Sequence, residues 1–269
     1  MWPSWAWFVQ LLEKVHLSLV NRMDKRSRLY LKNHSDMDQF ISLPQYESGL
    51  IVGEASEHGW EFVQLALLDY EHVFWANSKG EIDVSPEMKE KISFIQQDMY
   101  EANMAENILD EIAMFETFER SFPPLGLVVN LVEFKNEDSW SFDQAESNNP
   151  SISIPQLLEL NELSMRKMLK IGGGEILNVL SRPSDCPDFV HEMFRETQAL
   201  LMEIGDELNR AKREEGVHVH TLSYSPQSFA LQSESLPPEV AHDMAPASCS
   251  AKDIADYGYQ VLRVSRSHA

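Results

Sequence analysis

The residues with the most definite chemical potential are Glu133 and Lys135, at the end of an apolar run over 125–134. Residues two apart in a β-strand point to the same face, so this spacing predicts that the carboxylate and the amine lie side by side. A carboxylate can bind Mg²⁺ or Mn²⁺, and a lysine can orient a water molecule or stabilise developing phosphoryl charge. Asp83, in the short β-prone run 82–84, is the candidate second metal ligand.

The run Val132-Glu133-Phe134-Lys135 resembles the second half of the motif of PD-(D/E)xK nucleases. The resemblance covers the end of this apolar run and implies a metal-dependent nuclease with catalytic Asp83, Glu133 and Lys135. In such an enzyme Asp83 and Glu133 would hold the metal. The interval 125–132 contains no acidic residue, so the aspartate of the motif would have to come from beyond a predicted helix. An ordinary surface ion pair is the alternative interpretation.

Arg213 and His218 have the spacing of the arginine–histidine motif of HEPN ribonucleases. This resemblance implies a third possible function, a ribonuclease built on a helical bundle. Gly216 lies inside the motif and interrupts the helix that the family would require. A basic helix end that complements the helix dipole is the alternative.

The charge of the chain limits its partners. The sequence has 43 acidic and 22 basic residues and a formal net charge of -21. Residues 1–32 are basic, whereas residues 33–160 are strongly acidic. Such a field repels nucleic acid and acidic membranes and attracts basic proteins. We therefore do not expect the acidic part to bind nucleic acid directly.

A row of acidic residues without intervening lysine or arginine is the main candidate for partner binding. Its members are Asp98, Glu101, Glu106, Asp110, Glu111, Glu116 and Glu119. A solvated helix face is one interpretation, and a docking surface for a basic protein is the other. Our leading hypothesis from the sequence is a non-enzymatic interaction protein, such as an inhibitor, an immunity-type protein or a complex subunit. It would need no cofactor.

The apolar pattern predicts an α+β fold that is mainly helical. A small antiparallel or mixed sheet is expected from residues 49–84 and 125–134, with a helix over 56–76 as the alternative for the first region. Long helices are expected over 86–120, 155–171 and 187–213. The glycines at 172–174 are expected to break a helix, with a short helix following to Leu180. An edge strand is expected from Val217 to Tyr224.

The composition indicates two parts, although one integrated domain is the alternative. The N-terminal α+β part would span 1–135, and a mainly helical part would span 152–269, with a proline- and serine-rich segment at 225–250. The two cysteines lie far apart in the sequence, which favours the reducing cytoplasm. The tryptophans at positions 2, 5 and 7 are expected to pack against the protein rather than to contact a membrane.

Overall fold

The computed structural model describes residues 48–118, 124–134, 150–182, 188–212, 215–225, 228–232 and 250–268. These residues belong to one compact unit, Gln45–Ala269. The tryptophan-rich arm and most of the proline- and serine-rich segment lie outside the described residues. The two parts predicted from the sequence contribute neighbouring strands to the same sheet.

The centre of this unit is a seven-stranded sheet with the strand order β3-β2-β1-β4-β5-β6-β7. The first six strands are parallel to their neighbours, and β7 pairs antiparallel with β6. The strands are β1 (Ser48–Val52), β2 (His72–Asn77), β3 (Ile92–Gln96), β4 (Leu125–Glu133), β5 (Gly174–Ser181), β6 (Val217–Ser225) and β7 (Ser228–Gln232).

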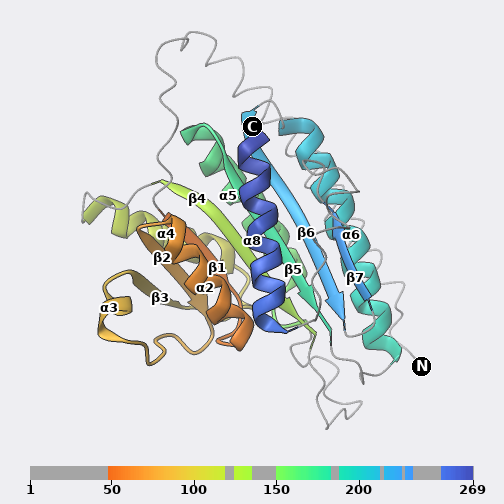
Figure 1. The fold of residues 1–269 in the computed structure, drawn as a ribbon, viewed down its shortest axis with the longest axis horizontal. Helices are drawn as coiled ribbons and strands as arrows, with labels where there is room; N and C mark the ends of the chain where they lie inside the picture. The colour runs from red at the N-terminus through yellow and green to blue at the C-terminus, as the bar shows by residue number, and fades with distance from the viewer. Residues whose placement is uncertain are drawn as a thin grey trace. The chain divides into compact units, whose positions relative to one another are not determined.

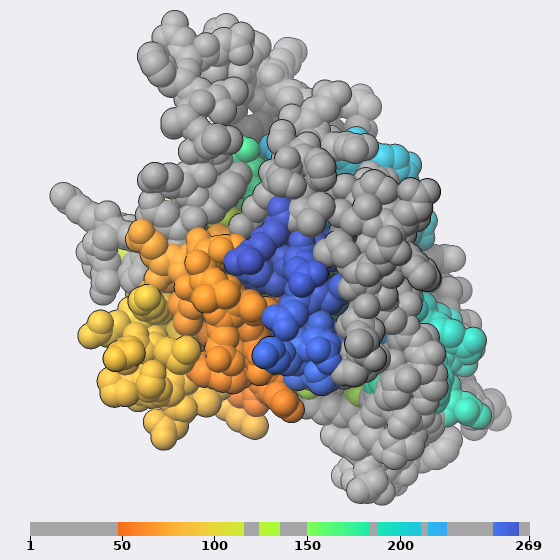
Figure 2. Space-filling model, in the orientation of Figure 1, coloured from red at the N-terminus to blue at the C-terminus, as the bar shows by residue number. Residues whose placement is uncertain are grey.

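Helices cover both faces of the sheet (Figure 1). They are α2 (Glu57–Asp69), α3 (Pro86–Lys89), α4 (Met104–Phe118), α5 (Ile154–Ile171), α6 (Asp188–Lys212) and α8 (Ala251–His268). The helices α2 and α8 contact each other over one face, where Figure 2 shows them side by side. On the opposite face α5 packs on β4 and β5, and α6 packs on β6.

Burial on both faces explains why the central strands are apolar along their whole length. Every residue of β1 is buried, as are all residues of β4 except its last. On the α2 and α8 side, Val129, Leu177 and Leu222 form one core cluster with Phe62 and Tyr257 of the covering helices. Strands of a parallel sheet that is buried on both faces have continuous apolar sequences and not an alternation of apolar and polar residues.

A group of buried amides marks the opposite face of the sheet. Asn130 and Asn178 are register partners on β4 and β5, and their side chains are 2.9 Å apart from Nδ2 to Oδ1. Asn161 of α5 accepts from Asn130 at 2.7 Å and donates to Asn178 at 3.1 Å. All three side chains are buried, so these hydrogen bonds fix α5 against the two strands.

The predicted fold class is wrong. A mainly helical α+β protein with a small antiparallel or mixed sheet was expected from 49–84 and 125–134. The structure instead has an extended, largely parallel sheet between two helical layers. Among the first six strands, each is joined to the next through a helix, which is the connection that parallel strands need.

Several individual elements also differ from the prediction. The expected helix over 86–120 is divided into α3, the strand β3 and α4. The region 49–84 contains only two strands, β1 and β2, with the helix α2 between them, and the β-prone run 82–84 is not a strand. Gly172 ends α5 in a left-handed conformation, and the chain continues directly as strand β5 where a short helix was expected. The strand from Val217 is internal to the sheet, between β5 and β7.

Other expected elements are confirmed. The strand over 125–134 is β4, and the helices over 155–171 and 187–213 are α5 and α6 within one residue at each end. These segments have unambiguous signals, namely a long β-branched run for β4 and a three- to four-residue apolar repeat for the two helices.

Candidate functional site

The strand order reverses between β1 and β4. From β1 the chain proceeds outward to β2 and β3, and it then crosses back to β4 on the other side of β1. In open parallel sheets, the crevice for a ligand lies outside the carboxyl ends of the strands at such a switch point. A ligand site is therefore expected between the loop from β1 to α2 and the last residues of β4.

Two glycines allow the loop between β1 and α2 to pack closely on the sheet. Gly53 follows β1 with φ at +146°, and a Cβ atom there would lie 2.7 Å from Leu131 Cβ. Gly59 lies in the first turn of α2, where a Cβ would lie 2.7 Å from Trp75 Cζ2. The first glycine thus serves the tight turn after the strand, and the second serves the contact between helix and sheet.

The N-terminus of α2 carries a serine cap that also contacts a carboxylate. Ser56 Oγ accepts a hydrogen bond from the Gly59 backbone N–H at 3.3 Å and donates to Glu133 Oε1 at 2.6 Å. The same carboxylate oxygen is 3.7 Å from His58 Nδ1. The Glu133 side chain, which is 20% exposed, therefore lies at the positive end of the α2 dipole.

Two hydroxyl groups lie on neighbouring strands beside Glu133. Glu133 is the register partner of Ser181 on β5, and Ser181 is the partner of Tyr224 on β6. Register partners in a parallel pair point to the same face, which here is the face of α2. The centroids of the His58 and Tyr224 rings are 5.5 Å apart. We call the group formed by Ser56, His58, Glu133, Ser181 and Tyr224 the carboxyl-edge cluster.

The carboxyl-edge cluster differs from a serine nucleophile site. In such a site an imidazole takes the proton of the serine hydroxyl. Here Ser56 donates directly to the Glu133 carboxylate, and His58 approaches the same oxygen. His58 Nε2 is buried and has no hydrogen-bond partner among the described residues.

An arginine follows Ser181 at the end of β5, and its side chain packs against α6 on the opposite face of the sheet. The Arg182 guanidinium is 5.5 Å from the centroid of the Phe194 ring, and its Nη1 is 3.0 Å from His191 Nε2. Its backbone N–H donates to the Tyr224 carbonyl at 3.3 Å. These contacts hold a permanent positive charge at the carboxyl edge of the sheet.

The end of β2 forms the other border of the switch point. The buried Asn77 Oδ1 accepts from the backbone N–H groups of Lys79 and Gly80, at 2.9 and 2.8 Å. Ser78 Oγ donates to Glu54 Oε2 at 3.0 Å and so connects this turn to the turn after β1. Burial, and then the charges of Glu54 and Asp98, raise the pKa of Tyr100, whose phenol therefore stays protonated.

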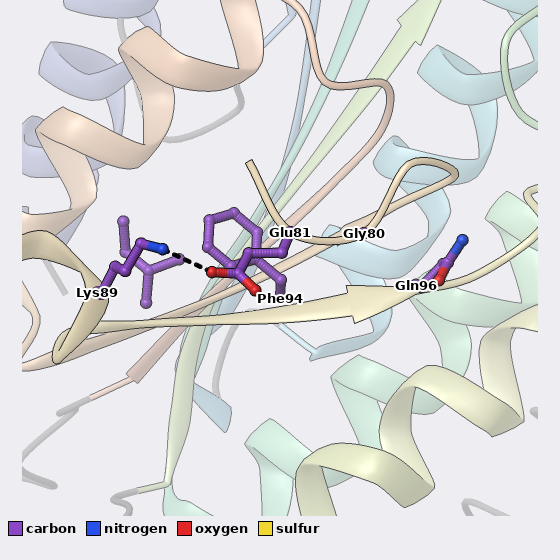
Figure 3. Close-up of a pocket in the computed structure, with 6 residues that line it drawn as sticks. Gly80, Glu81, Lys89, Phe94 and Gln96 are labelled. Carbon is purple, nitrogen blue, oxygen red and sulfur yellow. Dashed lines mark hydrogen bonds and ion pairs between the residues drawn. The ribbon is translucent and has the colours of Figure 1, made fainter. Parts of the chain in front are cut away.

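A separate shallow pocket of about 360 Å³ lies on the outer strand β3 (Figure 3). It is lined by Gly80, Glu81, Lys89, Ile92, Phe94 and Gln96. Lys89 Nζ is 2.8 Å from Glu81 Oε1, and this pairing raises the pKa of Lys89 and lowers that of Glu81. Both side chains are well exposed, so the pair holds the loop loosely and offers no enclosed site.

The structure does not bring the predicted metal ligands together. Glu133 ends β4, whereas Asp83 is exposed in the loop before α3, beyond β1 and β2 in the sheet. Lys135 lies outside the described residues. Within the described ranges, no group of three His, Cys, Asp or Glu side chains could hold a metal ion.

The predicted acidic row is not the face of a single helix. Asp98 and Glu101 precede α4, and Glu119 lies outside the described residues. Glu106, Asp110, Glu111 and Glu116 belong to α4. Arg213 of the predicted ribonuclease motif also lies outside the described residues, and His218 lies on β6 rather than on a helix.

The chain is similar in fold to solved short-chain dehydrogenase/reductase structures. One is the enzyme from Serratia marcescens, with 13% sequence identity and a TM-score of 0.55 over 82% of this chain and 94% of that chain. A doubly substituted variant of the Serratia marcescens enzyme matches with a TM-score of 0.56, at 13% identity over 83% of this chain and 93% of that one. The sequence matches no protein-family model and no curated protein.

These neighbours overturn the functions predicted from the sequence. The predictions of an acidic interaction protein, a PD-(D/E)xK nuclease and a HEPN ribonuclease are wrong, because the chain has the fold of dehydrogenases/reductases. The expectation of no cofactor, or of Mg²⁺ or Mn²⁺, is contradicted by the same similarity, since the solved structures that share this fold are named short-chain dehydrogenase/reductases. No described helix is both long and apolar enough to cross a membrane.

The turn after β1 was not predicted from the sequence. The signal was available as an apolar run that ends at Gly53 and is followed by a serine cap and a second glycine at position 59. The spacing differs from Gly-x-Gly-x-x-Gly, so the motif did not stand out. Ser181 and Tyr224 could not be found from the sequence, because only the sheet register brings them beside Glu133.

Proposed function

We propose that this chain is an oxidoreductase that binds a nicotinamide dinucleotide at the carboxyl edge between β1 and β4. The observation that supports this most directly is the glycine-bounded turn from β1 into α2 at the switch point of a parallel sheet. The similarity to dehydrogenase/reductase structures supports the same proposal at the level of the fold. We propose the cytoplasm as its location, and a basic protein partner stays a prediction.

The backbone at this turn fits a dinucleotide. In such folds one glycine makes the tight turn after the first strand and another permits close packing of the helix on the sheet. Gly53 and Gly59 serve these two purposes here, since any larger residue would collide with Leu131 or Trp75. The first N–H groups of α2 would hold the pyrophosphate, because a helix N-terminus favours anions. The acidic side chains of Glu54, Glu57 and Glu133 lie around this end of the helix, and their negative charges oppose the binding of a pyrophosphate there.

The end of β2 would contact the adenosine ribose. An acidic residue at this position favours a free ribose hydroxyl, whereas a basic residue nearby favours a ribose phosphate. This chain has Asn77 at the end of β2 and Lys79 two residues later. We therefore propose that NADPH is preferred over NADH.

A bound nicotinamide would supply the hydride donor or acceptor. The chain itself must exclude water and hold a proton near the reacting carbonyl or alcohol. Ser181 and Tyr224 have hydroxyl groups at the appropriate edge of the sheet, and the His58 imidazole lies beside Tyr224. The positive charge of Arg182 lies at the same edge but beside α6, on the other face of the sheet.

The proposal is tested by titrating the full chain with NADPH and NADH and measuring heat release or tryptophan fluorescence. We expect binding with a dissociation constant below about 1 mM, a range typical of enzyme ligands. Lys79→Ala should weaken the binding of NADPH more than that of NADH, while Lys91→Ala serves as a control of equal charge. Loss of NADPH absorbance with a panel of aldehydes and ketones would then identify substrates. Failure of both dinucleotides to bind would refute the proposal.

A further inference from the structure

The Glu133 carboxylate occupies the anion-binding end of α2. Its Oε1 accepts a short hydrogen bond of 2.6 Å from Ser56, the residue that caps the helix. The same serine hydroxyl accepts from the Gly59 N–H. The carboxylate is thus connected through one hydroxyl group to the first turn of the helix, where the helix dipole favours a negative charge.

The backbone of Glu133 is held in place, so any change of position at this residue must come from rotation of its side chain. Its backbone N–H donates to Ser151 Oγ at 2.9 Å, and its carbonyl accepts from the Ser151 N–H at 2.8 Å. The strand β4 also continues its pairing with β5 through Glu133 and Ser181. A ligand that needs this space must therefore displace the carboxylate by rotating the side chain, without moving the strand.

A pyrophosphate and this carboxylate cannot both be held by the same helix end. Two negative charges within a few ångströms repel each other strongly in a partly buried site, where water screens them less than in bulk. Glu57 in the first turn of α2 and Glu54 in the preceding turn add further negative charge. The described part of the chain therefore has an internal anion at the place where the dinucleotide would present its own.

We propose that Glu133 is an internal competitor for the pyrophosphate of the dinucleotide and thereby determines how tightly the site binds it. This inference rests on the proposed function. In the absence of ligand the carboxylate holds the Ser56 hydroxyl, and on binding it rotates away and the pyrophosphate takes its place. His58, which is 3.7 Å from the carboxylate, lies within reach of either anion.

The competitor can be tested with a substitution that removes charge but keeps shape. In Glu133→Gln the amide oxygen can still accept from Ser56, so the cap and the strand end are preserved. The Glu81→Gln variant is the matched control, because it removes the same unit of charge from the exposed loop at the β3 edge. Glu133→Ala is a second variant, and circular dichroism establishes that each protein is folded.

Calorimetric titration with NADPH should give about tenfold tighter binding to Glu133→Gln than to the unsubstituted chain, with Glu81→Gln unchanged. Adenosine, which has no phosphate, should bind equally to the unsubstituted chain and to all three variants. Equal NADPH affinities for the unsubstituted chain and Glu133→Gln, or a parallel gain for adenosine, would overturn the inference while leaving the proposed function intact. If neither NADPH nor NADH binds to any variant, the proposed function fails and the inference falls with it.

Discussion

The contact of Gly59 with the sheet leads to a prediction that compares two helical glycines. A Cβ atom at Gly59 would lie 2.7 Å from Trp75 Cζ2 and 3.1 Å from the Glu54 carbonyl oxygen. Trp75 is only 1% exposed, so it has no space into which to move. At Gly205 of α6 the nearest atoms, on Thr221 and Val219, are 3.8 Å away, an ordinary contact distance.

The two substitutions Gly59→Ala and Gly205→Ala should therefore change stability in opposite directions. Replacing glycine by alanine within a helix stabilises a protein by roughly 0.5–1 kcal/mol through backbone entropy. Overpacking of a well-filled core costs about 1–3 kcal/mol. We expect Gly205→Ala to raise the free energy of unfolding by about 0.5–1 kcal/mol and Gly59→Ala to lower it by about 1–2 kcal/mol.

Urea unfolding with an unchanged m-value would measure this difference. For a domain of this size, the gap of about 2 kcal/mol corresponds to about 4–8 °C in Tm. If Gly59→Ala were as stable as Gly205→Ala, α2 would be able to withdraw from Trp75 without loss, and our account of the turn after β1 would be refuted.

Two further predictions concern buried polar groups. Burial lowers the pKa of His72 from 6.5 to about 4. Between these pH values the imidazole is protonated in the unfolded chain but not in the folded one. Folding stability should therefore fall by about 3 kcal/mol as the pH decreases from 6.5 to 4. Urea unfolding across this range should show a smaller loss for His72→Gln, and an equal loss would contradict this explanation. Asn161→Leu should lower the free energy of unfolding by about 2 kcal/mol or more, because buried amides of Asn130 and Asn178 lose their partner. Thermal unfolding would measure this, with the isosteric Asn161→Asp as a comparison, and an unchanged Tm would show that the amide group contributes nothing.

The sequence predicted single elements better than their arrangement. The run 125–134 and the periodic segments that became α5 and α6 were identified, because local patterns determine them. The short strand β3 was assigned to a helix, since Ile92 and Ile95 also fit a helical repeat. Residues 92–96 form a strand rather than a helix because they pair with β2, and no local pattern encodes that contact.

One residue of the candidate site, Glu133, had been selected from the sequence, though for a different role. Glu133 was selected for its position at a strand end, but its assigned companions, Asp83 and Lys135, are not the residues described beside it. Its contacts are with Ser56 and His58, which come from a distant loop. A carboxylate next to a strand end is compatible with a metal site or with a helix cap, and only the fold distinguishes them.

The position of β1 has a consequence for how the chain reaches its native state. During synthesis β1, β2 and β3 emerge early, but the second edge of β1 pairs with β4, whose residues are made much later. Until Leu125–Glu133 leaves the ribosome, an entirely buried apolar strand has one unpaired edge in water. Long-range parallel pairing of this kind slows folding and exposes nascent chains to aggregation. The strand reversal between β1 and β4 therefore also determines how long a growing chain has an unpaired apolar strand edge.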